Sequence, residues 1–136
     1  MANVTITKFK LTSRTTAKTE QIGEAIVAGR VCLKVADKLM LANCTDADKT
    51  EGRYISLTDG DADGDYISVV DIESEVTLED TGTPFTVGAV YVLSATAGRI
   101  APIADLVSTN KLVVLGYGSA TNQIRFKLDN TGIAIP

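Results

Sequence analysis

The chain has 136 residues, of which 45% are hydrophobic and 22% are charged, and its net charge is −4. These values are typical of one globular domain with its own hydrophobic core, and the acidic balance argues against nucleic acid as a partner. Histidine and tryptophan are absent. Because histidine is the most common general base and a frequent metal ligand, we expect neither an enzyme nor a protein that needs a cofactor.

Two further classes are disfavoured by the distribution of apolar residues. The chain has no run of about 20 consecutive apolar residues, the length that a transmembrane helix needs. The first ten residues also lack the apolar segment of a signal peptide. We therefore expect no membrane partner, and synthesis in the cytoplasm.

Residues 1–20 differ in character from the rest of the chain. They are rich in threonine and lysine, contain few turn-forming residues, and carry four basic residues against one acidic residue. We predict that they form an extended arm, ordered against a partner or a neighbouring subunit, and that residues 21–136 form a single β-barrel-like domain. The apolar residues of such an arm can add a strand to a neighbour's sheet edge, while the basic residues meet acidic surface. The candidate contact residues are Val4, Ile6, Lys8, Phe9, Lys10, Arg14 and Lys18.

Short runs of alternating or β-branched residues recur along the chain, separated by Gly, Asp, Asn or Thr. This spacing is typical of an all-β sandwich or barrel and not of alternating strands and helices. The alternation is clearest near the end, where Ile124 and Phe126 point inward and Arg125 and Lys127 point outward. Only residues 45–51 and 101–108 suggest short helical turns. The predicted strands are residues 4–9, 31–35, 38–43, 54–58, 66–71, 75–79, 90–94, 112–116 and 124–128.

Residues 31–43 predict a β-hairpin with a two-residue turn at residues 36–37. In the register set by that turn, Cys32 and Cys44 point to opposite faces of the sheet, with Cys44 opposite Gly29. Two cysteines on opposite faces cannot form a disulfide, so we predict two buried free thiols. Two ligands are also too few to complete a zinc site.

Residues 46–80 are strongly acidic, with twelve acidic residues against two basic ones. An acidic middle and a basic arm suit head-to-tail or arm-to-neighbour contacts, because complementary charges steer association. The alternative is that both regions are solvated surface.

The segment 59–65 carries a carboxylate at every second position, with glycine at residues 60 and 64. Alternating carboxylates suit a calcium loop, because this cation prefers several oxygen ligands from one turn. An EF-hand loop that begins at residue 59 would need a glutamate at position 70, where the chain has Val70. The alternative is a polar turn between two strands, in which Asp and Gly are chosen for their backbone conformations. The candidate calcium ligands are Asp59, Asp61, Asp63 and Asp65.

The remaining polar residues do not form a recognisable catalytic motif. No serine lies in a Gly-x-Ser-x-Gly elbow. The glycine-rich segment 116–120 follows a strand but precedes no helix, so we predict a turn or bulge and not a dinucleotide-binding loop. The four tyrosines lie on separate predicted strands, where we expect them to cap the core. The apolar tail, residues 130–136, predicts that this end docks against another surface.

Taken in order, the segments of residues 24–128 resemble the small capsid decoration, or cement, proteins of tailed bacteriophages. The resemblance is carried by five segments in sequence order. These are the hairpin that begins at Ala28-Gly29-Arg30-Val31, the acidic segment leading to Gly52, the strand from Gly64 to Val69, the hairpin from Val87 to Gly98, and the closing strands from Leu115 to Phe126.

The resemblance implies an all-β fold, a small antiparallel β-barrel or β-sandwich of β-tulip or SH3-like type, with an extended N-terminal arm. It also implies a homotrimer on the outer surface of the expanded phage head, made in the host cytoplasm, that bridges neighbouring major capsid proteins. The family offers no catalytic residues and no cofactor to carry over. The alternative is a phage tail, receptor-binding or carbohydrate-binding β-module that uses calcium at residues 59–65.

Overall fold

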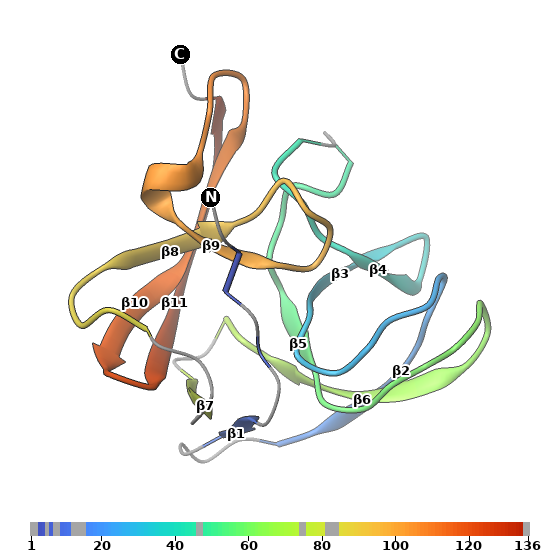
Figure 1. Cartoon of the computed structure of the whole chain (residues 1–136). Coiled ribbons are helices and arrows are strands. Elements are labelled where there is room, and N and C mark those ends of the chain that lie inside the picture. The colour runs from blue at the N-terminus through green and yellow to red at the C-terminus, as the bar shows by residue number, and fades with distance from the viewer. Residues whose placement is uncertain are drawn as a thin grey trace.

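The computed structural model describes residues 3–4, 6, 9–11, 16–45, 48–73, 76–80 and 85–134. Over these residues the chain forms eleven strands and one short 3-10 helix. The strands make two antiparallel sheets that lie side by side (Figure 1). The all-β prediction is confirmed, and of the two architectures that the sequence left open the sandwich-like one fits.

The six-stranded sheet has the order β1-β7-β11-β10-β8-β9, and the five-stranded sheet has the order β2-β6-β5-β3-β4. The strands of the first sheet are β1 (Phe9–Leu11), β7 (Thr77–Asp80), β8 (Val90–Leu93), β9 (Ile100–Pro102), β10 (Lys111–Ala120) and β11 (Gln123–Ala134). The strands of the second are β2 (Lys18–Gln21), β3 (Val31–Val35), β4 (Lys38–Leu41), β5 (Tyr54–Ser56) and β6 (Tyr66–Asp71). The 3-10 helix η1 (Ile103–Asp105) follows β9 directly.

The main core draws buried side chains from both sheets, and a second, smaller core belongs to the five-stranded sheet. The alternation along β3 shows how the two are related, because Val31 and Leu33 belong to the main core and Cys32 belongs to the smaller one. Ile22 and Ile26, which follow β2, are fully buried in the smaller core. The five-stranded sheet is therefore covered on both faces.

The β3–β4 hairpin has the predicted register up to the end of β4. Ala36 and Asp37 form its turn with φ values of 52° and 69°, as a two-residue hairpin turn of type I′ requires. Cys32 pairs with Leu41. The predicted register continues to Ala42, whose N–H donates to the carbonyl oxygen of Val31. It is wrong for Cys44, because the Cys44 N–H donates to the carbonyl oxygen of Ser94 and not to the predicted partner Gly29.

Three parts of the predicted arm pair with the two sheets. Val4 forms a bridge with Ile100 at one edge of the six-stranded sheet, and β1 pairs with β7 at the opposite edge. β2 crosses the predicted boundary at residue 20 and pairs with β6. This corrects the division into a separate arm and a domain, since the alternating apolar residues near the N-terminus find their partners in the chain's own sheets.

The C-terminal hairpin of β10 and β11 is much longer than predicted. The segment predicted as a turn or bulge lies inside β10, where the register with β11 shifts on both sides of Gly116 and Gly118. A Cβ atom at Gly118 would collide with the carbonyl oxygen of Thr86, and one at Gly116 would collide with that of Arg125. Glycine is needed here because neighbouring backbone approaches closely, and not because the chain turns.

Candidate functional site

The apolar residues of the predicted arm pack within this chain. Ile6 is a buried member of the main core, and Val4 and Phe9 are partly buried against it. Ile6 also lies close to Gly29, because a Cβ atom placed on Gly29 would be 3.0 Å from Cγ2 of Ile6. These three side chains contribute to the chain's own fold, so they are not available to pair with a neighbouring subunit.

The four basic residues of the predicted arm do not form one described cluster. Lys10 lies on β1 opposite Glu79, and Lys18 lies on β2 opposite Val69. Both lysines are exposed, but they belong to different sheets. Lys8 and Arg14 lie outside the described residues.

The acidic loop, defined here as residues 59–65, is held by its own carboxylates. Asp59 Oδ1 accepts a hydrogen bond of 2.7 Å from the N–H of Ala28. Asp65 Oδ2 accepts hydrogen bonds of 3.1 Å from the N–H groups of Asp61 and Ala62. These contacts fix the turn between β5 and β6, as the alternative interpretation of the segment requires.

The four candidate calcium ligands do not converge on one point. Asp63 forms an ion pair of 2.7 Å with Lys38 Nζ, and both side chains are largely exposed. Among the residues that the structure describes, no three Asp, Glu, Cys or His side chains are arranged to hold a metal ion. The geometry therefore favours a structural turn over a calcium loop.

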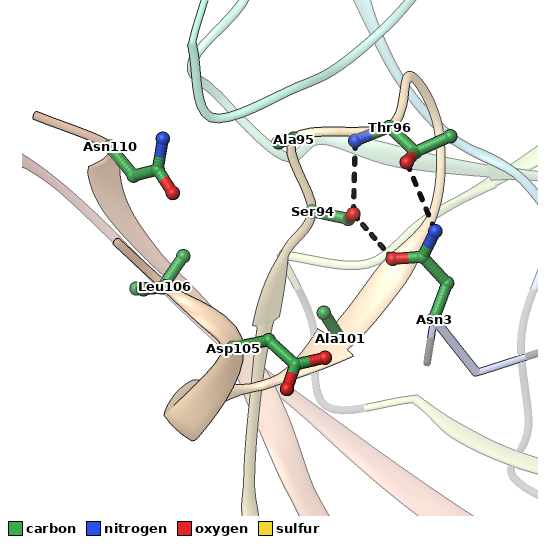
Figure 2. Close-up of a pocket in the computed structure, with 8 residues that line it drawn as sticks. All are labelled: Asn3, Ser94, Ala95, Thr96, Ala101, Asp105, Leu106 and Asn110. Carbon is green, nitrogen blue, oxygen red and sulfur yellow. Dashed lines mark hydrogen bonds between the residues drawn. The ribbon is translucent and has the colours of Figure 1, made fainter. Parts of the chain in front are cut away.

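Figure 2 shows a pocket of about 160 Å³ between η1 and the turn that joins β8 to β9. Three of its polar residues bind one another, and a fourth, Asn110, accepts a hydrogen bond from the N–H of Val107. The Ser94 hydroxyl donates to Asn3 Oδ1 at 2.5 Å and accepts from the N–H of Thr96 at 3.0 Å. Asn3 Nδ2 in turn donates to Thr96 Oγ1 at 3.0 Å.

This network ties the N-terminal segment to the β8–β9 turn and does not resemble a catalytic site. Ser94 gives its proton to an amide oxygen, which is not a general base. The pocket is also smaller than the roughly 300 to 1,000 Å³ of most small-molecule sites. We therefore assign the pocket a structural role.

Both cysteines are free and buried, as predicted. Burial, and then the nearby carboxylate of Glu24, raise the pKa of Cys32 to about 12, against an opposing effect of Arg30. Burial also raises the pKa of Cys44. Because the thiolate is the reactive form, neither residue has the environment of a nucleophile.

Exposed apolar side chains gather near one end of the six-stranded sheet, which we name the hairpin end and define by Ile103, Val107 and Ile133. Ile103 begins η1, and Val107 begins the turn that leads into β10. Ile133 lies on β11 opposite Leu112 and is 66% exposed. In Figure 1, η1, the start of β10 and the end of β11 lie at the upper end of the molecule, near the C-terminus. Ile133 belongs to the predicted apolar tail, so the tail is exposed at this residue. Residues 135–136 lie outside the described residues, and the docking of the tail stays a prediction.

A second exposed apolar group lies on the outward face of the six-stranded sheet. We name it the sheet face and define it by Val90 and Tyr117, which are 36% and 38% exposed. The prediction that the tyrosines cap the core is wrong for Tyr117 and for Tyr66, which is 66% exposed. The signal that sequence reasoning missed is a register shift between Val114 and Gly116, which reverses the alternation so that Tyr117 points outward.

Comparison with known proteins adds no family assignment. The chain matches no protein-family model and no curated protein. Within the described part of the chain, no helix has the length and apolar character needed to span a membrane.

Proposed function

We propose that this protein is a capsid decoration protein of a tailed bacteriophage. In this role it binds the outer surface of the expanded head as a homotrimer and stabilises the contacts between neighbouring major capsid proteins. It would be made in the host cytoplasm and act on the exterior of the virion. The ordered segments over residues 24–128, which resemble this family, suggest the role.

The observation that carries the proposal is the apolar character of the hairpin end. Three aliphatic side chains are exposed there, at the end of a sheet whose main core is already complete without them. Burying one such side chain against a partner contributes on the order of 1 to 2 kcal/mol. A symmetric shell repeats the same contact many times, so modest contacts per copy add up to a large stabilisation of the whole particle.

This proposal places the capsid contact at the hairpin end and not at the predicted arm. Val4, Ile6 and Phe9 contribute to the main core, so removing them to bind a neighbour would destabilise the chain itself. The hairpin end has no such conflict, because Val107 and Ile133 are mostly exposed. The alternative of a calcium-dependent receptor-binding or carbohydrate-binding module has no comparable observation in its favour.

The test is sedimentation of the purified protein with expanded, undecorated shells of the phage that encodes it. We expect the wild-type protein to sediment with the shells. We expect the double variant V107D/I133D to lose at least tenfold in shell affinity, because two carboxylates replace the apolar contact. The matched control V27D changes an exposed valine beside β5 of the other sheet, and it should bind as the wild type does. Wild-type protein that stays in the supernatant would end the proposal.

A further inference from the structure

The sheet face lies on a row of side chains that crosses four adjacent strands. Val90 on β8 pairs with Tyr117 on β10, Tyr117 pairs with Arg125 on β11, and Arg125 pairs with Thr77 on β7. Directly paired residues of adjacent strands point to the same side of a sheet. The next residues along β7 and β11, Leu78 and Ile124, are fully buried in the main core. The row therefore lies on the side of the sheet that faces away from the core.

The composition of this row is that of a protein-binding surface. Tyrosine and arginine are the residue types most enriched, with tryptophan, among the side chains that dominate protein interfaces. The hairpin end is formed by other residues, so the proposed capsid contact does not use this row.

The surroundings of the row carry charges of both signs, with three basic residues, Arg125, Lys127 and Lys10, against two acidic ones, Glu79 opposite Lys10 and the exposed Asp129. Lys127 follows Arg125 by two positions on β11 and is exposed, and within the described residues it forms no ion pair of 4.0 Å or less. Lys10 lies on the edge strand β1 of the same sheet. An exposed aromatic residue with cations beside it fits a partner that brings carboxylates and an apolar side chain together.

The chain itself carries such a partner surface on its other sheet. Asp61, Asp63 and Asp65 are exposed in the acidic loop, and Tyr66, the next residue, is 66% exposed at the start of β6. The only one of these carboxylates in a described ion pair is Asp63, which pairs with Lys38. In Figure 1 the six-stranded sheet lies on the left and the five-stranded sheet on the right, so one molecule presents the two surfaces at different places.

We propose that the sheet face binds the acidic loop of a second copy of this chain. The contact is head-to-tail, because each copy offers one surface of each kind, and a head-to-tail contact closes into a ring when the rotation between copies allows it. The inference deepens the proposed function and rests on it, since it names the two surfaces through which copies of a decoration protein would join. Its electrostatic part is screened by salt, which makes the association dependent on ionic strength.

The test is the oligomeric state of the full chain without shells, measured by sedimentation velocity over a range of concentrations at low and high salt. We expect the wild type to associate at low salt and to dissociate in part at high salt. K127E and D61K should each weaken association about tenfold, because each places two like charges across the contact. The matched control K18E makes the same charge change at an exposed position of β2 and should associate as the wild type does.

A charge swap separates a specific contact from an effect of net charge. The chain with both K127E and D61K should regain the association of the wild type, because each copy again meets an opposite charge. The chain with K18E and D61K has the same net charge but should stay as weak as D61K. A wild type that is monomeric under all conditions, or a swap that restores nothing, would overturn the inference.

The same proteins, sedimented with expanded shells, distinguish the two proposals. A wild type that binds shells but remains monomeric in solution would overturn the head-to-tail contact and leave the proposed function standing. A wild type that associates with itself through these residues but ignores shells would overturn the proposed function and support the contact.

Discussion

The two sheets of this protein use their apolar residues in different ways. The five-stranded sheet has a core on each face, the main core on one side and the smaller core around Cys32 and Leu39 on the other. The six-stranded sheet shares the main core on one face and leaves Val90 and Tyr117 exposed on the other. Apolar side chains that folding does not bury are available for binding, so the difference indicates where partners attach.

Two serines, one on each sheet, contrast a buried hydroxyl with an exposed one. Ser56 on β5 is fully buried, and its hydroxyl donates to the carbonyl oxygen of Val27 at 2.7 Å and accepts from the N–H of Arg30 at 2.9 Å. Ser119 on β10, by contrast, is an exposed serine of the six-stranded sheet. Removing the two hydroxyls should therefore have different effects on stability.

The largest effect is expected from the core that the two sheets share. Phe126 is fully buried in it, so F126A should lower the free energy of unfolding by about 3 to 5 kcal/mol, because it removes apolar contacts and leaves a cavity. Urea denaturation of the two proteins measures the difference. If F126A and wild type unfold at the same urea concentration, the main core is not where the structure places it.

The next largest effect is expected from removing the buried hydroxyl of Ser56. S56A should lower the free energy of unfolding by about 1 to 3 kcal/mol, because two buried backbone groups lose their partner. The control S119A should change it by less than about 0.5 kcal/mol, as is usual for an exposed position. Equal effects of the two substitutions would contradict the burial and the hydrogen bonds of the Ser56 hydroxyl.

A third prediction concerns the pH dependence of stability in the smaller core. The pKa of Cys32 is raised from 9.0 to about 12, so the unfolded chain loses this proton near pH 9 and the folded chain keeps it. The folded state therefore holds more protons than the unfolded state between these values, and stability must fall as the pH rises.

The measurement compares wild type with C32V, which has no thiol to titrate. The contribution of Cys32 is fully present below pH 9, and at pH 10 it should have fallen by about 1.4 kcal/mol. Unfolding of both proteins by urea at pH 7.5 and pH 10, with a reducing agent present, isolates this contribution. A difference between wild type and C32V that does not change with pH would contradict the burial of this thiol.

The smallest effect on stability is expected at the sheet face. Y117A should change the free energy of unfolding by less than about 0.5 kcal/mol, because the side chain points away from the main core. The same variant should weaken self-association in sedimentation velocity about tenfold, through loss of an aromatic anchor. A variant that unfolds readily but associates normally would reverse the roles that we assign to Tyr117.

Features of this structure that depend on neighbouring residues could be predicted from the sequence, and features that depend on pairing between distant strands could not. The β3–β4 hairpin was predictable, because its turn at Ala36 and Asp37 sets the register of the strands beside it. β2 was not, because Lys18–Gln21 has no apolar alternation and becomes a strand only by pairing with β6. The exposed sheet face was missed for a similar reason, since a register shift inside β10 depends on how β10 meets β11. Long-range pairing, and not residue type, decides both cases.

Capsid binding through the hairpin end is tested most directly by an electron cryomicroscopy reconstruction of expanded shells incubated with the wild-type protein. We expect added density on the outside of the shell, with Ile103, Val107 and Ile133 turned toward the major capsid protein. Shells that show no added density, or added density with these three residues facing solvent, would contradict this expectation.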